Sequence, residues 1–262
     1  HARGFTSWNH FTAMLFGQLS GQDSLRGIEA GLATQASTLY HLGITPVAKS
    51  TLSYANEHRS HELFKLIFFL MLSKCQPAAP RHSFRFKNEV YSMDASTIDL
   101  CLSLYNWAKF RTTKGAIKLH VKLNHSGYLP VFMVVTTGKV HEQKVAPTIP
   151  LESGDVAIFD RGYTDFRWYQ TLDDKGVYFV TRMKKNAYYK AVKRKDVSAY
   201  QNIYSDQTIE LKGFYSSKKF PSRLRRIRSK DPSTNKIIVL LTNNFSWSAQ
   251  TIAKLYKERW QI

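Results

Sequence analysis

The sequence predicts an α/β protein with a mixed β-sheet and helices on its faces, preceded by an α-helical region and interrupted by a β-rich insertion. Three observations support this prediction. Apolar residues recur at helical spacing in residues 1–75, three β-prone runs precede a strand–helix–strand pattern in residues 89–185, and short β-prone runs fill residues 186–245. A chain of 262 residues, 43% of them hydrophobic, can bury a sizeable core in more than one domain.

The N-terminal region is predicted to be helical throughout. Its first helix follows from apolar residues at helical spacing: Trp8, Phe11, Leu15 and Leu19. A later helix over residues 45–59 follows a turn at Gly43 and exposes polar side chains, as a helix-turn-helix recognition helix does. An ordinary amphipathic helix in a small bundle explains the same pattern equally well. Residues 76–88 contain two prolines and several basic residues and are expected to form a linker.

Two aspartates follow β-prone runs in the predicted sheet. Residues 90–97 lead into Asp94, and residues 155–163 place four apolar residues before Asp160, with Gly162 where the backbone must turn. Carboxylates at the ends of two buried strands suit Mg²⁺, which prefers hard oxygen ligands and usually takes one or two carboxylates. A lone aspartate is more often a helix cap or a turn residue, so the assignment depends on the rest of the chain.

Between the two aspartates the sequence predicts an antiparallel meander. In residues 116–124 apolar and polar residues alternate, which places one set on each face of a strand. A turn then leads into a second strand over residues 129–137. His141 and Glu142 begin the next segment and could approach the predicted metal site, but a position on the solvated surface is the preferred interpretation.

The charge of the chain points to a polyanionic partner. Lys and Arg number 38 against 19 acidic residues, a formal net charge of +19, and residues 182–230 alone hold 15 basic and 3 acidic residues. Interleaved aromatic residues suit base stacking, although packing within a sheet explains most of them. A protein kept soluble by surface lysines is the alternative. The candidate DNA-contacting residues in this region are Arg223, Arg225, Arg226 and Arg228.

The remaining composition excludes several other classes of protein. Cys75 and Cys101 lack the spacing of a structural zinc site, and two scattered thiols suit a reducing cytoplasm. The most apolar run, residues 63–72, is interrupted by Lys65 and is far shorter than the ~20 residues that span a bilayer.

The last segment, residues 246–262, is predicted to be a helix capped by Ser246 or Ser248. Tyr256 and Arg259 lie three residues apart and therefore share one helical face.

The order of these motifs resembles the DDE transposases of bacterial insertion sequences, in particular the insertion sequence four family. The match rests on Asp94, on Asp-Arg-Gly-Tyr at residues 160–163, and on Tyr256 and Arg259, which fit the spacing of that family's Tyr-x-x-Arg-x-x-x-Glu-x(6)-Lys signature. The resemblance runs from about Tyr91 to the last residue. It implies a ribonuclease-H-like mixed sheet, with a β-strand insertion before the helix that carries the Glu, and a DNA-binding helical region at residues 1–75.

The resemblance also implies an activity and its partners. The expected reaction is metal-dependent phosphoryl transfer on double-stranded DNA, namely strand cleavage and strand transfer at insertion-sequence ends. Asp94 and Asp160 would hold two Mg²⁺ ions, which Mn²⁺ can replace, while Tyr256 and Arg259 contact DNA. The expected assembly is a homodimer on DNA in the bacterial cytoplasm, associated with the nucleoid and not with a membrane. The alternatives are a ribonuclease-H-like nuclease and a transposase-derived DNA-binding protein without catalysis.

The signature places the third carboxylate four residues after Arg259, one position past Ile262. On this pattern we expect residues 1–262 to lack both that Glu and the later Lys, and therefore to bind DNA without cutting it. Glu258 does not fill the position, because it lies five residues earlier and, at about 100° per residue, faces a different direction around the helix.

Overall fold

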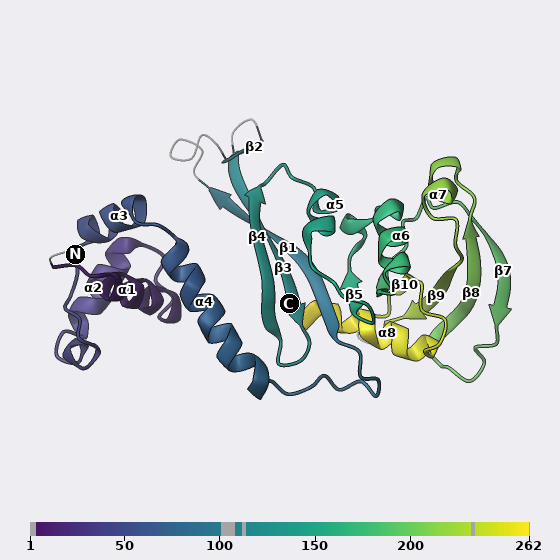
Figure 1. Cartoon of the computed structure of the whole chain (residues 1–262), viewed down its shortest axis with the longest axis horizontal. Helices are drawn as coiled ribbons and strands as arrows, with labels where there is room; N and C mark the ends of the chain where they lie inside the picture. The colour runs from purple at the N-terminus through teal and green to yellow at the C-terminus, as the bar shows by residue number, and fades with distance from the viewer. Residues whose placement is uncertain (1–3, 101–107, 112–113, 232–233, 262) are drawn as a thin grey trace. The chain divides into compact units, whose positions relative to one another are not determined.

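The computed structural model describes residues 4–100, 108–111, 114–231 and 234–261. The chain forms two compact units, His1–Cys75 and Gln76–Ile262 (Figure 1). The first unit is built from helices and the second around a mixed β-sheet, so the predicted mixed α/β class is confirmed. Cys101, one of the two cysteines of the chain, lies outside the described residues.

Within its described residues the first unit consists of four α-helices and one 3₁₀ turn. They are α1 (Ser7–Leu19), α2 (Leu25–Thr34), η1 (Leu39–Leu42), α3 (Lys49–His58) and α4 (Glu62–Cys75). The hydroxyl of Thr6 caps α1 by accepting a hydrogen bond from the Asn9 backbone N–H at 3.2 Å. Helices α1 and α2 approach closely at Gly17, where a β-carbon would lie 2.5 Å from Ile28 Cδ1.

The predicted helix over residues 45–59 is present as α3. Residues 35–48 separate it from α2, which is a longer connection than the turn of about three or four residues in a helix-turn-helix. Leu52 of α3 is buried with Ile28 and Leu32 of α2. One face of α3 therefore belongs to the core of this small helical unit.

The second unit contains the predicted three strands followed by strand, helix and strand, together with elements that the pattern did not predict. Its strands are β1 (Val90–Leu100), β2 (Lys109–Arg111), β3 (Lys114–Asn124), β4 (Leu129–Thr137), β5 (Val156–Phe159), β6 (Tyr178–Arg182), β7 (Tyr189–Lys195), β8 (Ile203–Leu211), β9 (Leu224–Lys230) and β10 (Ile237–Thr242). Its α-helices are α5 (Glu142–Val145), α6 (Phe166–Asp174), α7 (Phe214–Lys219) and α8 (Ala249–Glu258). A 3₁₀ turn, η5 (Arg161–Tyr163), follows β5.

The strands form one mixed sheet in the order β2-β3-β1-β5-β6-β10-β9-β8-β7, with β4 paired to β3 (Figure 1). The antiparallel meander of β1, β3 and β4 is the predicted one. β5 joins β1 in parallel, and β6 joins β5 in parallel. Because β1, β5 and β6 point the same way, the residues that follow β5 and β6 and their neighbours on β1 lie at one edge of the sheet, which we call the carboxyl-end edge.

Helices cover both faces of the central strands. α6 packs Trp168 and Tyr169 against Phe159 and Phe179 on one face, in a cluster of aromatic rings. α8 packs Ile252, Leu255 and Tyr256 on the opposite face, against Ile158 and Val180. Helices cover both faces of β5, so a side chain is buried whichever face it points to. All four residues of β5 are therefore buried and apolar.

On β3 the polar set of the predicted alternation is the more buried one. His120 and Lys122 are buried. The Nζ of Lys122 donates to the Pro150 carbonyl at 2.6 Å and lies 4.2 Å from the centre of the Tyr91 ring, and both contacts offset part of the cost of burying its charge. Of the apolar set, Ile117, Leu119 and Val121 are partly exposed, and Leu123 at the end of the strand is buried. The segment between β4 and β5 therefore covers the polar face of this strand.

The β-rich insertion extends the sheet and does not form a separate layer. β10 pairs with β6, and β9, β8 and β7 follow it outward. The sequence pattern predicted neither β7 nor α7. β7 is an edge strand whose side chains are mainly basic, and lysine on an exposed edge discourages pairing with another chain. None of the helices in the described ranges is long and apolar enough to cross a membrane.

Candidate active site and nucleic-acid surface

Asp94 and Asp160 occupy equivalent positions on neighbouring parallel strands. The register pairs Met93 with Phe159, so each aspartate is the next residue along its chain segment. Neighbouring strands lie about 4.8 Å apart, which brings both aspartates to the same place on the carboxyl-end edge. β5 stops at Phe159, whereas β1 continues to Leu100. The sequence prediction of a strand end is therefore right for Asp160 and wrong for Asp94.

Local hydrogen bonding orients Asp160. The residue caps η5, and its Oδ1 accepts a hydrogen bond from the Gly162 backbone N–H at 2.7 Å. A β-carbon on Gly162 would lie 2.8 Å from that same oxygen and 3.6 Å from Glu142 Oε2. Only glycine fits here without displacing a carboxylate. The carboxylates of Asp160, after β5, and of Glu142, on α5, both border the space that a β-carbon would fill.

Glu142 is a third carboxylate, which the sequence pattern assigned to the solvated surface. Its side chain is only 22% exposed, and Lys118 Nζ donates to Glu142 Oε1 at 2.9 Å and to the Val140 carbonyl at 3.0 Å. Burial opposes ionisation of Glu142 and is the largest single effect, but the hydrogen bond from Lys118, a backbone hydrogen bond and the charges of Lys118 and His120 together outweigh it and hold the pKa below the usual value. Neighbouring His141 is exposed. Only the pairing of β3 with β4 and the return of α5 bring Lys118 to Glu142, so local sequence carried no signal of this pair.

Arg259 supplies a cation on the other side of Asp94. Its Nη1 lies 3.6 Å from Asp94 Oδ2, and its side chain is 6% exposed while that of Asp94 is 40% exposed. The guanidinium also lies 4.1 Å from the centre of the Trp260 ring and 5.6 Å from that of Tyr256. The two residues of the terminal motif therefore lie together, and Arg259 reaches the first aspartate.

The carboxylates and Arg259 all act on the hydroxyl of Tyr163. Burial raises its pKa, the carboxylates of Asp94, Glu142 and Asp160 raise it further, and Arg259 lowers it. The oxygen is buried and has no hydrogen-bond partner among the described residues. Burial likewise raises the pKa of Tyr256, which Arg259 and Arg182 oppose. Three carboxylates and one guanidinium thus act on the same buried hydroxyl.

The donor set fits a hard divalent cation. Carboxylate oxygens are the ligands that Mg²⁺ prefers, and the carboxylates of Asp94, Asp160 and Glu142 each approach the Tyr163 hydroxyl closely enough to raise its pKa. In the part of the chain that the structure describes, no three His, Cys, Asp or Glu side chains are grouped closely enough to form a ready-made metal site. Arg259 pairs with Asp94, and Lys118 pairs with Glu142. A cation that binds here therefore competes with two internal ion pairs.

Glu258 lies elsewhere, as expected from its spacing. The hydroxyl of Tyr128, which follows β3, donates to Glu258 Oε2 at 3.2 Å. This hydrogen bond holds Glu258 against the β3–β4 hairpin.

The four candidate arginines of the insertion do not share one environment. Arg223 and Arg228 are exposed, and Arg226 is half-buried with its guanidinium 5.0 Å from the centre of the Tyr189 ring. Arg225 is 2% exposed. Its Nε and Nη2 donate to Asp206 at 2.8 and 2.6 Å, and Nη1 donates to the Trp247 carbonyl at 2.5 Å. All three nitrogens are used inside the protein, so Arg225 does not fit the DNA contact expected from the sequence.

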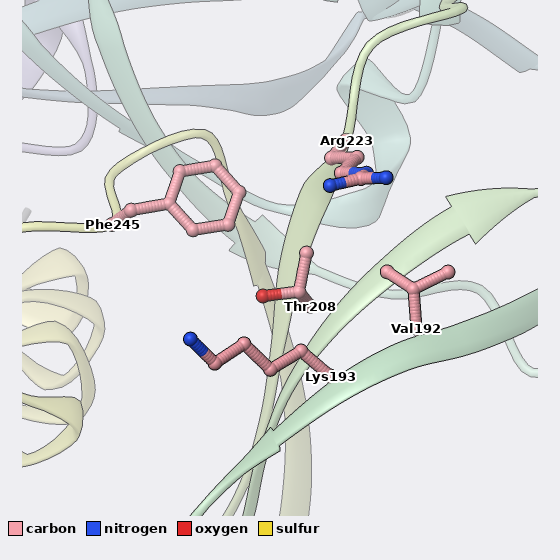
Figure 2. A pocket seen from close by; sticks show the side chains of 5 residues that line it. All are labelled: Val192, Lys193, Thr208, Arg223 and Phe245. Atoms are coloured by element: carbon pink, nitrogen blue, oxygen red, sulfur yellow. The ribbon is translucent and has the colours of Figure 1, made fainter.

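A basic pocket of about 460 Å³ opens on the insertion. Its lining comes from β7, from β8, from the residue just before β9 and from the loop before α8: Val192, Lys193, Thr208, Arg223 and Phe245. Figure 2 shows Lys193 and Arg223 on either side of Thr208, with the Phe245 ring beside them. Two cations and an exposed ring are groups that can hold a phosphate and contact a base.

Acidic groups at the edge of a mixed sheet, beside a strongly basic extension, are typical of proteins that act on nucleic acids. A family model described as "Transposase DDE domain" matches residues 85–262, and a model described as a domain of unknown function matches residues 1–45. The chain belongs to the family of proteins with a transposase DDE domain.

Two curated relatives agree with this family. "Putative transposase y4zB" of Sinorhizobium fredii is 30% identical over 215 residues, covering 80% of this chain and 59% of the relative. "Probable transposase for insertion sequence element IS5377" of Geobacillus stearothermophilus is 29% identical over 217 residues, covering 81% and 56%. The chain thus spans somewhat more than half the length of these relatives.

Among solved structures, endonuclease V of Ciona intestinalis in complex with a 23mer DNA matches at 12% identity. The match covers 75% of this chain and 88% of that one, with a TM-score of 0.28, which is too low to support an argument.

Proposed function

We propose that this protein catalyses metal-dependent phosphoryl transfer on DNA, cutting and joining strands at the ends of an insertion sequence. The observation that carries the proposal is the placement of Asp94 and Asp160 side by side on parallel strands, with Arg259 against Asp94. The family membership supports it, and a ribonuclease-H-like fold and assembly as a homodimer on DNA are part of the same proposal.

Each residue of the carboxyl-end edge has a role in this proposal. Asp94 and Asp160 would hold the divalent cations, and Glu142 would orient or share one of them. Such cations activate the attacking oxygen and stabilise the leaving oxygen of an in-line displacement. Arg259 leaves its position 3.6 Å from Asp94 to bind a phosphate oxygen near the cut. Tyr256 and Trp260 pack against the guanidinium and keep it at this edge.

The exposed arginines of the insertion, Arg223 and Arg228, together with half-buried Arg226, bind the DNA backbone in this proposal. Their contacts are sequence-independent, because phosphates carry no base information. Recognition of particular ends is then left to other parts of the protein, among which the N-terminal helical unit is the candidate.

The test replaces each aspartate in the full-length protein. Asp94→Asn and Asp160→Asn are each expected to lower Mg²⁺-dependent DNA cleavage by roughly 10³-fold or more, because a bound cation contributes several kcal/mol to the transition state. Mn²⁺ affinity, measured by calorimetry, should fall in both variants, while DNA affinity and the thermal midpoint should stay close to wild type. Asp99→Asn is the matched control, since Asp99 is an exposed carboxylate on the opposite face of the same strand.

Wild-type cleavage in either aspartate variant would contradict the assignment. A pre-cleaved DNA end with a free 3′ hydroxyl separates the remaining alternatives. Joining of that end to a target supports a transposase. Cleavage without joining indicates a nuclease, and binding without either reaction indicates a protein that has kept only DNA recognition.

A further inference from the structure

A second pocket, of about 420 Å³, opens at the carboxyl-end edge next to the candidate active site. Its walls are the segment after β5, the segment after β6, and helix α7. Gln143 connects the pocket to the candidate active site, because it lines the pocket and directly follows Glu142 in sequence. Its Nε2 donates to the carbonyl of Thr164, another lining residue, at 2.7 Å. Because β5 and β6 are parallel neighbours, this pocket and Asp160 lie on the same edge of one sheet.

Aromatic rings that the protein core does not use line this pocket. Tyr188, Phe214 and Tyr215 are 71%, 66% and 75% exposed. Phe214 and Tyr215 lie edge to face with ring centres 5.2 Å apart, so they present two differently oriented surfaces. Phe166, at the start of α6, is half-buried beside Tyr169 and forms part of the same lining. Exposed rings gathered around a hollow mark a place where a flat apolar group binds.

The charges around the pocket are mainly positive. Lys184 and Lys219 line it, and Lys218 Nζ lies 4.2 Å from the centre of the Phe214 ring. Asp165 is the acidic residue of the lining, and its Oδ1 is already used in accepting a hydrogen bond from the Arg167 backbone N–H at 2.9 Å. A ligand that combines flat rings with negative charge fits this lining better than a neutral apolar ligand or a peptide without acidic residues.

We propose that this pocket binds an unpaired nucleotide of single-stranded DNA. The base stacks on the rings of α7 and Tyr188, and the adjoining phosphates contact the lysines. The proposal rests on the proposed function, because a strand whose base occupies this pocket runs along the carboxyl-end edge toward Asp160. It adds that the DNA in this region is unpaired and not a closed duplex.

Binding of short oligonucleotides tests the proposal without catalysis. The probe is a single-stranded DNA of about ten nucleotides carrying one 2-aminopurine, and its affinity is measured by anisotropy in EDTA, against a blunt duplex of the same length. Phe214→Ala and Tyr215→Ala should each weaken single-strand binding roughly 5- to 100-fold and release the quenching of 2-aminopurine. Phe214→Tyr and Tyr215→Phe should restore both, and duplex affinity should change much less.

The matched control is Tyr204→Ala, which removes a ring 49% exposed on β8 outside this pocket. All replaced side chains are on the surface, so unchanged circular dichroism and thermal midpoint are expected. Unchanged single-strand affinity, an equal loss for duplex and single strand, or an equal loss in Tyr204→Ala would each overturn the proposal. Because the assay contains EDTA, it measures single-strand binding without metal-dependent cleavage. If Asp94→Asn cleaves DNA like wild type, the proposed function is contradicted, but the binding assay still tests this pocket. The two proposals can therefore fail separately.

Discussion

Two arginines, each almost fully buried, illustrate how differently the same side chain is used in this protein. Arg225 and its partner Asp206 are both buried, at 2% and 5% exposure, and two hydrogen bonds join them. Arg259 is 6% exposed, but its partner Asp94 is 40% exposed and stands 3.6 Å away. The first pair is closed and structural. The second is loose and opens to solvent on the carboxylate side, which is what a site that must exchange partners requires. The exposure of the carboxylate, more than that of the arginine, separates the two roles.

The largest expected effect tests the closed pair. Arg225→Ala leaves the Asp206 carboxylate buried without its cation, so the free energy of unfolding should fall by about 3–5 kcal/mol in urea denaturation. The control is Arg223→Ala, because Arg223 is 64% exposed and its interaction with Glu210 is a surface pair expected to contribute at most about 1 kcal/mol. Equal losses in the two variants would show that burial does not separate the two pairs. Replacing both partners, Arg225→Met with Asp206→Leu, should recover much of the loss.

The loose pair should show the opposite balance. Arg259→Ala is expected to lower the cleavage rate of the full-length protein by roughly 10²–10³-fold, the usual cost of removing one group that stabilises transition-state charge. Its effect on unfolding should be smaller than that of Arg225→Ala, since Asp94 keeps access to water. Arg259→Lys keeps the charge and separates charge from guanidinium geometry. A variant that unfolds as readily as Arg225→Ala but still cleaves DNA would reverse the comparison.

A buried polar pair without ions provides a third case. His125 is 3% exposed, and its Nε2 lies 2.5 Å from Ser92 Oγ. Burial, and to a smaller extent the charge of His82, lower the pKa of His125 to about 4. His125 therefore binds a proton near pH 6.5 in the unfolded chain but only near pH 4 in the folded protein. Because the unfolded chain binds more protons between these values, the protein becomes less stable as pH falls from about 6.5 to about 4. His125→Gln should flatten the pH dependence of the unfolding midpoint between those values. An unchanged slope would show that His125 accepts its proton in the folded state.

The smallest effect on stability is expected from the basic residues of the insertion that are exposed or half-buried. Arg223→Ala, Arg226→Ala and Arg228→Ala combined should change the free energy of unfolding far less than Arg225→Ala alone. DNA affinity should nevertheless fall for all sequences, and the slope of log affinity against log salt should flatten by about 0.9 for each phosphate that is no longer neutralised. A salt slope identical to wild type would place the DNA backbone on another surface.

Sequence reasoning succeeded where local pattern determines structure. The apolar runs before Asp94 and Asp160 and the meander appear near their predicted bounds. The helix predicted over residues 246–262 is present as α8, but it ends at Glu258, and Arg259 lies in the 3₁₀ turn Arg259–Gln261 that follows. It failed where the deciding interaction joins distant residues. The residues next to Arg225 in sequence do not indicate its buried partner Asp206, 19 residues away. The residues next to Glu142 likewise do not indicate its partner Lys118. β7 was missed because its basic composition reflects an exposed edge, which lowers the β signal that buried strands carry. The pocket around α7 depends on a six-residue helix too short to produce helical periodicity.

The pairing of β10 with β6 has a mechanical consequence. Leu240, Leu241 and Thr242 are hydrogen-bonded in register with the strand next to β5, so the arginines of β9 and the aspartates of β1 and β5 belong to one continuous ladder. At about 4.8 Å per strand, four steps from β1 to β9 span roughly 19 Å, close to the length of five or six nucleotides of a duplex strand. Under the proposed function, a DNA backbone bound on β9 lies at a set distance from the carboxylates, and the sheet then fixes how far from that contact a strand is cut.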